Sequence, residues 1–134
     1  MRIVSRTTRS MLDQRQAERQ RRRAAAGPLH SAFPNVEQVR VVLRFVTPKG
    51  PAPAAQTHAL YPAAPASFEF SCPFGDCDGS FDLDDVIRPL LAKSGGSASG
   101  TQSCAGSRAG GNMTRQPCRL RLAFRVLATY RLRA

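Results

Sequence analysis

Four cysteines are the residues of this chain whose type and spacing could do chemistry, and they are Cys72, Cys77, Cys104 and Cys118. Four thiolates arranged as a tetrahedron at about 2.3 Å from one ion make a closed structural zinc site. The first two cysteines flank a Pro/Gly turn, C-P-F-G-D-C, the third lies in a Gly/Ser segment, and the fourth opens the last apolar stretch. We therefore predict that all four hold one structural Zn²⁺.

Other states of these cysteines stay open. Four residues separate the first pair and thirteen separate the second, whereas a zinc knuckle usually spaces its ligands by about two. Free buried thiols, or a disulfide between Cys104 and Cys118 after oxidation, fit the same positions. A catalytic or redox-active thiol is less favoured, because no CxxC motif is present and no histidine is paired with a thiol. His58 is expected to be an ordinary polar group of a short strand rather than a ligand.

A strand, a turn and a helix over residues 68–91 are predicted to position the first two cysteines. Residues 68–72 alternate apolar and polar side chains, which is typical of a strand with one buried face. Residues 81–86 indicate the start of a helix, with Asp82 as its N-cap and acidic side chains in its first turn. Apolar side chains then recur at helical spacing. Pro89 is expected to kink this helix or end it early.

Two long alternating stretches predict the main sheet. Residues 36–46 and 118–133 each place apolar side chains on one face and arginines on the other. We expect them to pair as antiparallel strands packed on the central helix, with a short strand at 57–61. The predicted fold class is therefore α+β, a small antiparallel sheet packed on one main helix. Residues 93–111 are rich in Gly and Ser and are expected to be flexible, with at most a brief strand at 101–104.

The predicted domain organisation is a basic arm at residues 1–27 and a single zinc-ribbon-like domain at 28–134. The arm combines good helix formers with too few apolar side chains to fix it to a core, so we expect a disordered tail or a marginal helix. It functions in this interpretation as a nucleic-acid-binding arm, and a merely solvated tail is the alternative. Its candidate contact residues are Arg15, Arg19, Arg21, Arg22 and Arg23.

The net charge of +11 favours a polyanionic partner. Guanidinium groups fit phosphate oxygens, and alternation places a row of them on the outer face of the predicted sheet. Phe124 and Tyr130 alternate onto the opposite face, so we expect contact with RNA, DNA or a ribonucleoprotein through backbone charge, with little sequence selectivity. Arginine enrichment by codon bias is the alternative. The candidate residues of this face are Arg40, Arg44, Arg119, Arg121, Arg125, Arg131 and Arg133.

A second functional hypothesis uses the acidic residues. Five aspartates crowd into residues 76–85, and a protein-interaction or adaptor module could use this turn and helix as its contact surface, with no nucleic-acid role. We do not predict an enzyme. The aspartates lack the EF-hand pattern, and no Gly-rich phosphate loop follows a strand.

Residues 68–120 resemble zinc-ribbon and treble-clef domains, in which a strand-borne knuckle and a second ligand pair clasp one zinc ion. The chain is also similar to short bacterial proteins of unassigned function that carry a CP-x₃-C-x-G-x-F-D-L run. The matching residues are Cys72, Pro73, Cys77, Gly79, Phe81, Asp82 and Leu83. This resemblance implies a small bacterial protein with the four cysteines as zinc ligands.

Location is predicted from what the chain lacks. No run of about 18 apolar residues is present, and the N-terminus has no apolar region of a secretory signal. We therefore expect no membrane span and a cytoplasmic location, where a reducing environment favours metal binding over disulfides. The Arg-rich start also has the character of an organelle transit peptide, but Asp13 and Glu18 interrupt it.

Overall fold

The computed structural model describes residues 6–109 and 114–131, and the side chains from residue 11 onward within them. The main sheet has four antiparallel strands in the order β2-β1-β8-β5, and two separate hairpins, β3-β4 and β6-β7, form two-stranded sheets of their own. The elements in chain order are α1 (Arg6–Ala25), α2 (Leu29–Ala32), β1 (Val36–Val46), β2 (Gln56–Leu60), β3 (Glu69–Ser71), β4 (Ser80–Asp82), α3 (Asp84–Ala92), β5 (Ser97–Ser103), β6 (Ser107–Ala109), β7 (Arg115–Pro117) and β8 (Arg121–Tyr130).

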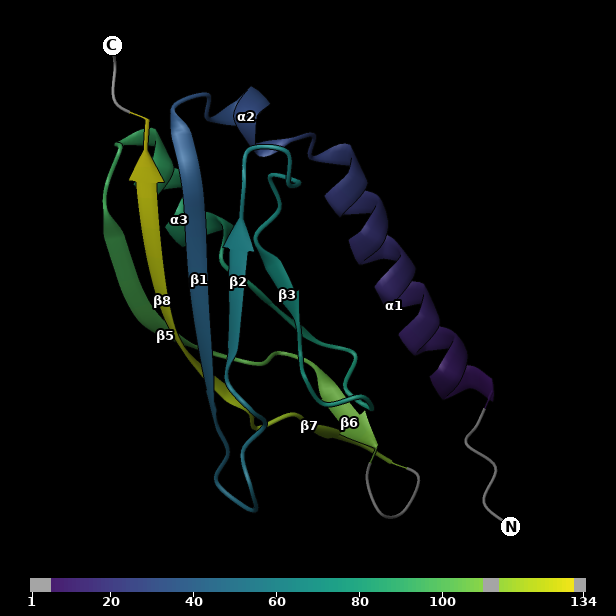
Figure 1. Ribbon diagram of the computed structural model, residues 1–134. Coiled ribbons are helices and arrows are strands. Elements are labelled where there is room, and N and C mark those ends of the chain that lie inside the picture. The colour runs from purple at the N-terminus through teal and green to yellow at the C-terminus, as the bar shows by residue number, and fades with distance from the viewer. Residues whose placement is uncertain (1–5, 110–113, 132–134) are drawn as a thin grey trace.

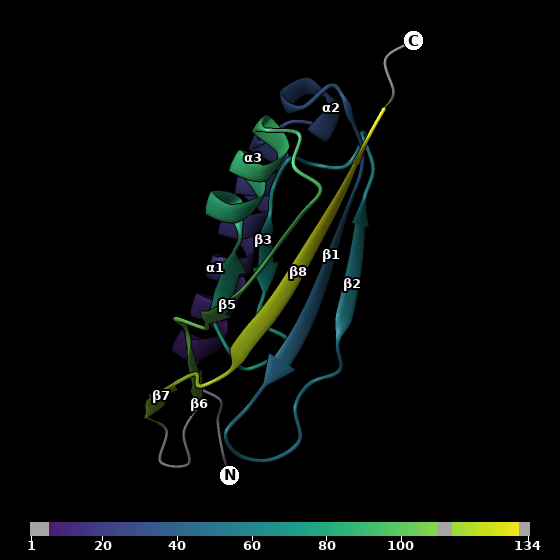
Figure 2. The same cartoon turned by 90° about the vertical axis from the view of Figure 1, so that its left-hand side faces the viewer.

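The four-stranded sheet divides the molecule into a covered side and an uncovered side. Figures 1 and 2 show α3, α1 and the β3-β4 hairpin on one side of it, with no element on the other. This arrangement confirms the predicted α+β class, in which a small antiparallel sheet packs on one main helix. No helix within the described residues is long and apolar enough to cross a membrane.

The central strand pair follows the predicted alternation. β1 has the predicted bounds and pairs antiparallel with β8 from Val46 opposite Arg121 to Val36 opposite Tyr130. Their inward side chains are buried, because alternate residues of a strand point to the same face. Phe68, Phe81 and Ile87 of the covering layer are fully buried against them. The hydrophobic core therefore lies between the sheet and the layer formed by α3 and the β3-β4 hairpin.

The start of the central helix differs from the prediction. Ser80–Asp82 forms strand β4, which pairs with β3, and α3 begins only at Asp84. Phe81 lies opposite Phe70 in this hairpin, with its ring 6.1 Å from that of Phe45, so burial in the core outweighs its helical pattern. Leu83, and not the predicted Asp82, stands at the N-cap position, and no side chain caps the helix there. Asp82 lies one residue earlier, and its Oδ1 accepts a hydrogen bond from the Asp84 N–H at 2.9 Å.

Pro89 does not end α3, since the helix continues for three more residues to Ala92. A proline at this position removes the hydrogen bond to the carbonyl four residues earlier, which belongs to Asp85. Both residues are exposed, so water can reach the unpaired carbonyl. The predicted early stop is therefore wrong, because solvent offsets the lost hydrogen bond.

The Gly/Ser segment that was expected to be flexible contains a strand. All seven residues of Ser97–Ser103 pair with β8, from Ser97 opposite Leu127 to Ser103 opposite Arg121. Small side chains suit this position, because a Cβ on Gly100 would lie 2.8 Å from the Phe124 ring. The pairing supplies hydrogen-bond partners to backbone groups along an edge of β8 that would otherwise be free. The composition of the Gly/Ser segment does not reveal that such an edge is available.

Residues 6–25 of the predicted basic arm form the helix α1. The helix contacts the covered side of the molecule through polar groups. Arg22 pairs with Glu69 at 3.1 Å, and Arg19 Nη1 donates to the Asp78 carbonyl at 3.3 Å. The sequence has too few apolar side chains here to pack the helix on a core. In the structure, hydrogen bonds and an ion pair hold the helix in place instead.

Candidate metal centre

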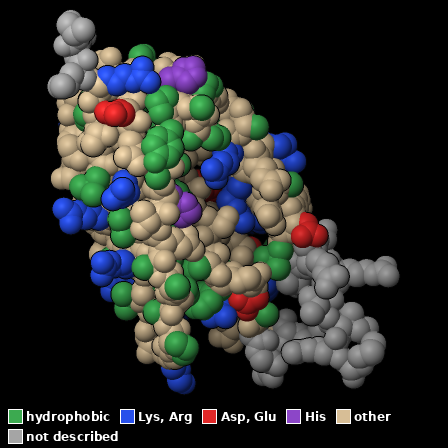
Figure 3. Space-filling model, viewed as in Figure 1, with side chains coloured by type: hydrophobic (Ala, Val, Ile, Leu, Met, Phe, Trp, Pro, Cys, Tyr) green, Lys and Arg blue, Asp and Glu red, His purple; other side chains and the backbone are tan. Residues whose placement is uncertain are grey.

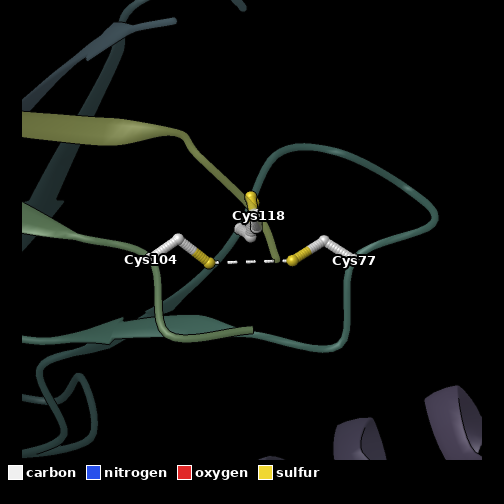
Figure 4. A group of neighbouring side chains, drawn as sticks. Cys77, Cys104 and Cys118 are labelled. Carbon is white, nitrogen blue, oxygen red and sulfur yellow. Dashed lines mark hydrogen bonds between the residues drawn. The ribbon is translucent and has the colours of Figure 1, made fainter. Parts of the chain in front are cut away.

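The four cysteine sulfurs converge on one point, as predicted for a metal site. Their Sγ atoms all lie within 4.8 Å of one another. Cys77 Sγ lies 3.6 Å from Cys104 Sγ, and Cys72 Sγ lies 3.9 Å from Cys118 Sγ. Bonds of about 2.3 Å to a central ion give a tetrahedron with edges of about 3.8 Å, so both distances fit a tetrahedral thiolate site. Figure 4 shows Cys77 and Cys104 directed toward each other, with Cys118 beside them.

The first ligand pair lies in the loop that connects β3 to β4. Cys72 directly follows β3, and its N–H donates to the Gly79 carbonyl at 3.1 Å, which extends the strand pairing by one step. The Cys77 N–H donates to the Phe74 carbonyl at 3.1 Å and closes the turn. Both sulfurs therefore project from one rigid loop.

The second pair is equally close in space, in spite of the thirteen residues between its members. The Cys104 N–H donates to the Leu120 carbonyl at 3.0 Å, and the Cys118 N–H donates to the Gly106 carbonyl at 2.9 Å. The β6-β7 hairpin accounts for the intervening chain. The unusual spacing is therefore a hairpin inserted into a second cysteine loop, and it leaves the ligand geometry unchanged.

Backbone amides point at the sulfur atoms. The N–H groups of Gly79 and Gly106 donate to the sulfurs of Cys77 and Cys104 at 3.3 and 3.4 Å. An amide that donates to a thiolate stabilises its negative charge, as required of a metal ligand. Each of these donors lies two residues after its cysteine, so the two loops repeat one local arrangement.

Burial makes these thiols reluctant to ionise without a cation. Their residues are only 6–8% exposed and no disulfide joins them. Desolvation raises the pKa of Cys77 to about 12 and also raises the pKa of Cys72 and Cys104, while amide hydrogen bonds oppose the shift. A divalent cation at the centre reverses this preference, because it stabilises the thiolates directly.

Charged side chains tie the β6-β7 hairpin to the first cysteine loop. Asp78 Oδ1 accepts a hydrogen bond from the Ser107 N–H at 2.7 Å and lies 3.7 Å from Arg115 Nη2. Asp76 pairs with Arg108 at 2.9 Å, and the Arg108 guanidinium lies 3.7 Å from the centre of the Phe74 ring. Asp76 and Asp78 of the acidic turn therefore bind the β6-β7 hairpin, which connects the two cysteines of the second pair.

The sheet arginines lie on the uncovered face in a staggered pattern. Arg40 lies opposite Leu127, Arg44 opposite Ala123, and Val42 opposite Arg125, while Val46 lies opposite Arg121. Each cross-strand pair therefore combines one arginine with one apolar side chain, and the four guanidiniums alternate between the two strands. All four arginines are exposed, as are Arg119 and Arg131 beyond the ends of β8. Arg133 lies outside the described residues.

The helix α1, which carries the other predicted arginines, lies on the other side of the sheet (Figure 2). Arg15, Arg21 and Arg23 are exposed, whereas Arg19 and Arg22 make the contacts that hold the helix. The structure therefore brings the four predicted metal ligands together and separates the predicted nucleic-acid residues into two groups.

Gly79 was named from the sequence only as part of a resemblance, and Gly106 was given no role in this centre. Both follow a cysteine at the same distance, in Cys77-Asp78-Gly79 and Cys104-Ala105-Gly106. This repeated C-x-G pattern was visible in the sequence and would have identified the two loops as equivalent. Comparison of the chain with protein-family models, with curated proteins and with solved structures found no match.

Proposed function

We propose that the protein is a zinc-stabilised basic module that binds RNA, DNA or a ribonucleoprotein through phosphate charge. The convergence of four buried sulfurs carries the metal part of this proposal. Thiolate-only tetrahedral sites select zinc or iron, and zinc is the ion of closed structural sites that do no redox chemistry. The ion would link the β3-β4 hairpin to the ends of β5 and β8, and so supply folding free energy to a small core.

The uncovered sheet face supports the nucleic-acid part. Residues 40–46 of β1 and 121–127 of β8 contain four arginines on this face and no acidic residue. Successive same-face positions of a strand are about 6.8 Å apart, so the staggered guanidiniums form a continuous cationic band. Apolar neighbours keep the guanidiniums apart and leave their donors free for phosphate oxygens. Recognition through such a band depends on phosphate charge and carries little base information.

The test is the salt dependence of binding to a single-stranded RNA and to a DNA duplex, measured by fluorescence anisotropy. Affinity should fall steeply between about 50 and 200 mM salt, with a slope set by the number of phosphates contacted. The double variant Arg40→Gln/Arg44→Gln should reduce this slope by about 1.4 with the single-stranded RNA and by about 1.8 with the DNA duplex. Absence of binding to either polymer at about 50 mM salt would contradict a nucleic-acid role.

A variant of α1 provides the matched control. Arg15→Gln/Arg21→Gln removes the same charge from exposed positions on the opposite side of the sheet. It should change the slope less than the sheet variant if the band on β1 and β8 makes the contacts. Equal losses would show that net charge, and no particular face, determines the affinity.

The adaptor hypothesis finds less support in the contacts. Asp76 and Asp78 are paired with the β6-β7 hairpin, and Asp82 and Asp84 make hydrogen bonds around the start of α3. Of the five aspartates, Asp85 alone is both exposed and without such a contact among the described residues. The acidic stretch therefore offers a partner little free negative charge.

A further inference from the structure

A cavity of about 400 Å³ lies between α1 and the strands β2 and β3. The cavity lies on the covered side of the sheet. His58 of β2 lines the cavity, and this residue lies opposite Val41, whose side chain is buried on the covered side. Figure 3, which views the molecule from the uncovered face of the sheet, shows Lys or Arg side chains within a hollow of the surface. A volume of this size falls within the range of small-molecule sites in proteins, about 300 to 1,000 Å³.

One wall of the cavity is the polar face of α1. Gln16, Arg19, Gln20 and Arg23 line it. They recur every three or four residues and so share one face of the helix. This wall offers two guanidiniums and two amides, which are donors suited to an oxyanion.

The positive charge of this wall is not neutralised within the cavity. Glu69 is the single acidic residue of the lining, and its carboxylate already accepts hydrogen bonds from Arg22 at 3.1 Å and from the Ser80 hydroxyl at 2.6 Å. Arg19 Nε is buried and has no hydrogen-bond partner among the described residues. The Arg23 side chain makes no hydrogen bond or ion pair with the rest of the described chain. An unpaired buried donor costs free energy that a bound anion would recover.

The opposite wall carries two flat rings. The centres of the His58 and Phe70 rings are 4.8 Å apart, and both residues line the cavity. Gln56 Oε1 lies 3.0 Å from His58 Nε2 and fixes the imidazole. Burial and the nearby Arg23 charge hold the pKa of His58 below its usual value, so the ring is neutral at pH 7. A neutral aromatic surface suits stacking with a planar organic group.

We propose that this cavity binds a phosphate ester of nucleoside size, with the phosphate on Arg19 and Arg23 and the base against His58 and Phe70. Such a ligand would also bridge α1 to β2 and β3, where the helix is otherwise held by few polar contacts. The site is separate from the arginine face of the sheet and does not depend on nucleic-acid binding there. The phosphate ester would be a free nucleotide or one nucleotide of a longer strand.

Calorimetric titration of the full metal-loaded chain with AMP, UMP, adenosine and inorganic phosphate tests the proposal. The two nucleotides should bind at least about tenfold more tightly than adenosine or phosphate alone, because only they engage both walls. Arg23→Gln should weaken AMP binding at least about tenfold. Arg21→Gln is the matched control, because Arg21 is exposed and does not line the cavity.

Trypsin digestion gives a second readout. AMP should slow cleavage at the arginines of α1 and leave cleavage after the exposed Lys49 of the β1-β2 loop unchanged. A dinucleotide that binds more tightly than AMP would identify a strand as the source of the nucleotide, and equal binding would identify a free nucleotide. The proposal is overturned if neither nucleotide binds below about 10 mM, if adenosine binds as tightly as AMP, or if Arg21→Gln weakens binding as much as Arg23→Gln.

Discussion

Gly79 and Gly106 face each other so closely that neither can carry a side chain. A Cβ on Gly79 would lie 2.6 Å from Cys104 Sγ and 2.7 Å from Gly106 Cα, and a Cβ on Gly106 would meet the Gly79 backbone. The two cysteine loops are therefore in backbone contact, and this contact lets sulfurs from both loops reach one point. The glycines determine how close the ligand pairs come, because backbone cannot move aside as a flexible side chain does.

Gly79→Ala or Gly106→Ala should separate the loops and lower both metal affinity and thermal stability. Overpacking of this kind costs about 1–3 kcal/mol, measured as the free energy of unfolding in the presence of zinc. Gly75→Ala is the control, since nothing lies within 4 Å of its Cβ and it belongs to the same turn. If Gly75→Ala destabilises the protein as much as Gly79→Ala, the close approach of the loops is not the cause.

Elemental analysis of the purified protein should find one zinc ion per chain. Cys72→Ser should lose most of it, because a neutral hydroxyl is a poor ligand where a thiolate is needed. Ser71→Ala, at an exposed neighbouring position, should keep full occupancy. Removal of the metal by a chelator should lower the melting temperature of the wild type and of Ser71→Ala, with little further effect on Cys72→Ser. Full zinc content in Cys72→Ser would contradict a four-cysteine site.

Asp78→Ala should destabilise the metal centre without removing a ligand. The change leaves the Ser107 N–H without its acceptor and removes the carboxylate that lies 3.7 Å from Arg115 Nη2, at a cost of about 1–3 kcal/mol in the free energy of unfolding. Chemical denaturation of the metal-loaded protein measures this cost. Asp85→Ala is the comparison, because Asp85 is exposed in the first turn of α3 and should lose only part of its helix-dipole stabilisation. Similar losses in both variants would argue against the proposed support.

His58 should make the protein less stable as the pH falls below about 6.5, which is the pKa of a histidine side chain in an unfolded chain. Burial and Arg23 lower its pKa in the folded state, so below this pH the unfolded chain binds a proton that the folded chain does not. His58→Gln should reduce this loss in thermal scans between pH 5 and pH 7, whereas substitution of the exposed His30 should not. Arg19 and Glu69 line the same cavity and face His58 there. An undiminished loss of stability in His58→Gln would contradict the assignment to His58.

Local sequence patterns were sufficient to predict the strands in which buried and exposed residues alternate. The alternation of residues 36–46 predicted β1 with its observed bounds, and β8 lies within its predicted stretch. The same local reasoning misplaced the start of α3, because residues 80–82 have a helical pattern and yet pair with β3. It also treated β5 as flexible, since glycine and serine have no preference that reveals a partner strand. Which edge is available for pairing depends on β8 and lies outside the segment itself.

The sequence by itself determined that four thiols and two arginine-bearing strands exist, because residue type and alternation are local properties. Tertiary structure alone decided that residues 72 and 118 meet, with their sulfurs 3.9 Å apart, and that the thirteen-residue spacing folds into a hairpin. It also decided that the arginines of α1 and of the sheet lie on opposite sides. Contacts between distant segments depend on strand pairing and backbone packing, whose free energies are summed over the whole fold and leave no signal in a single stretch of chain.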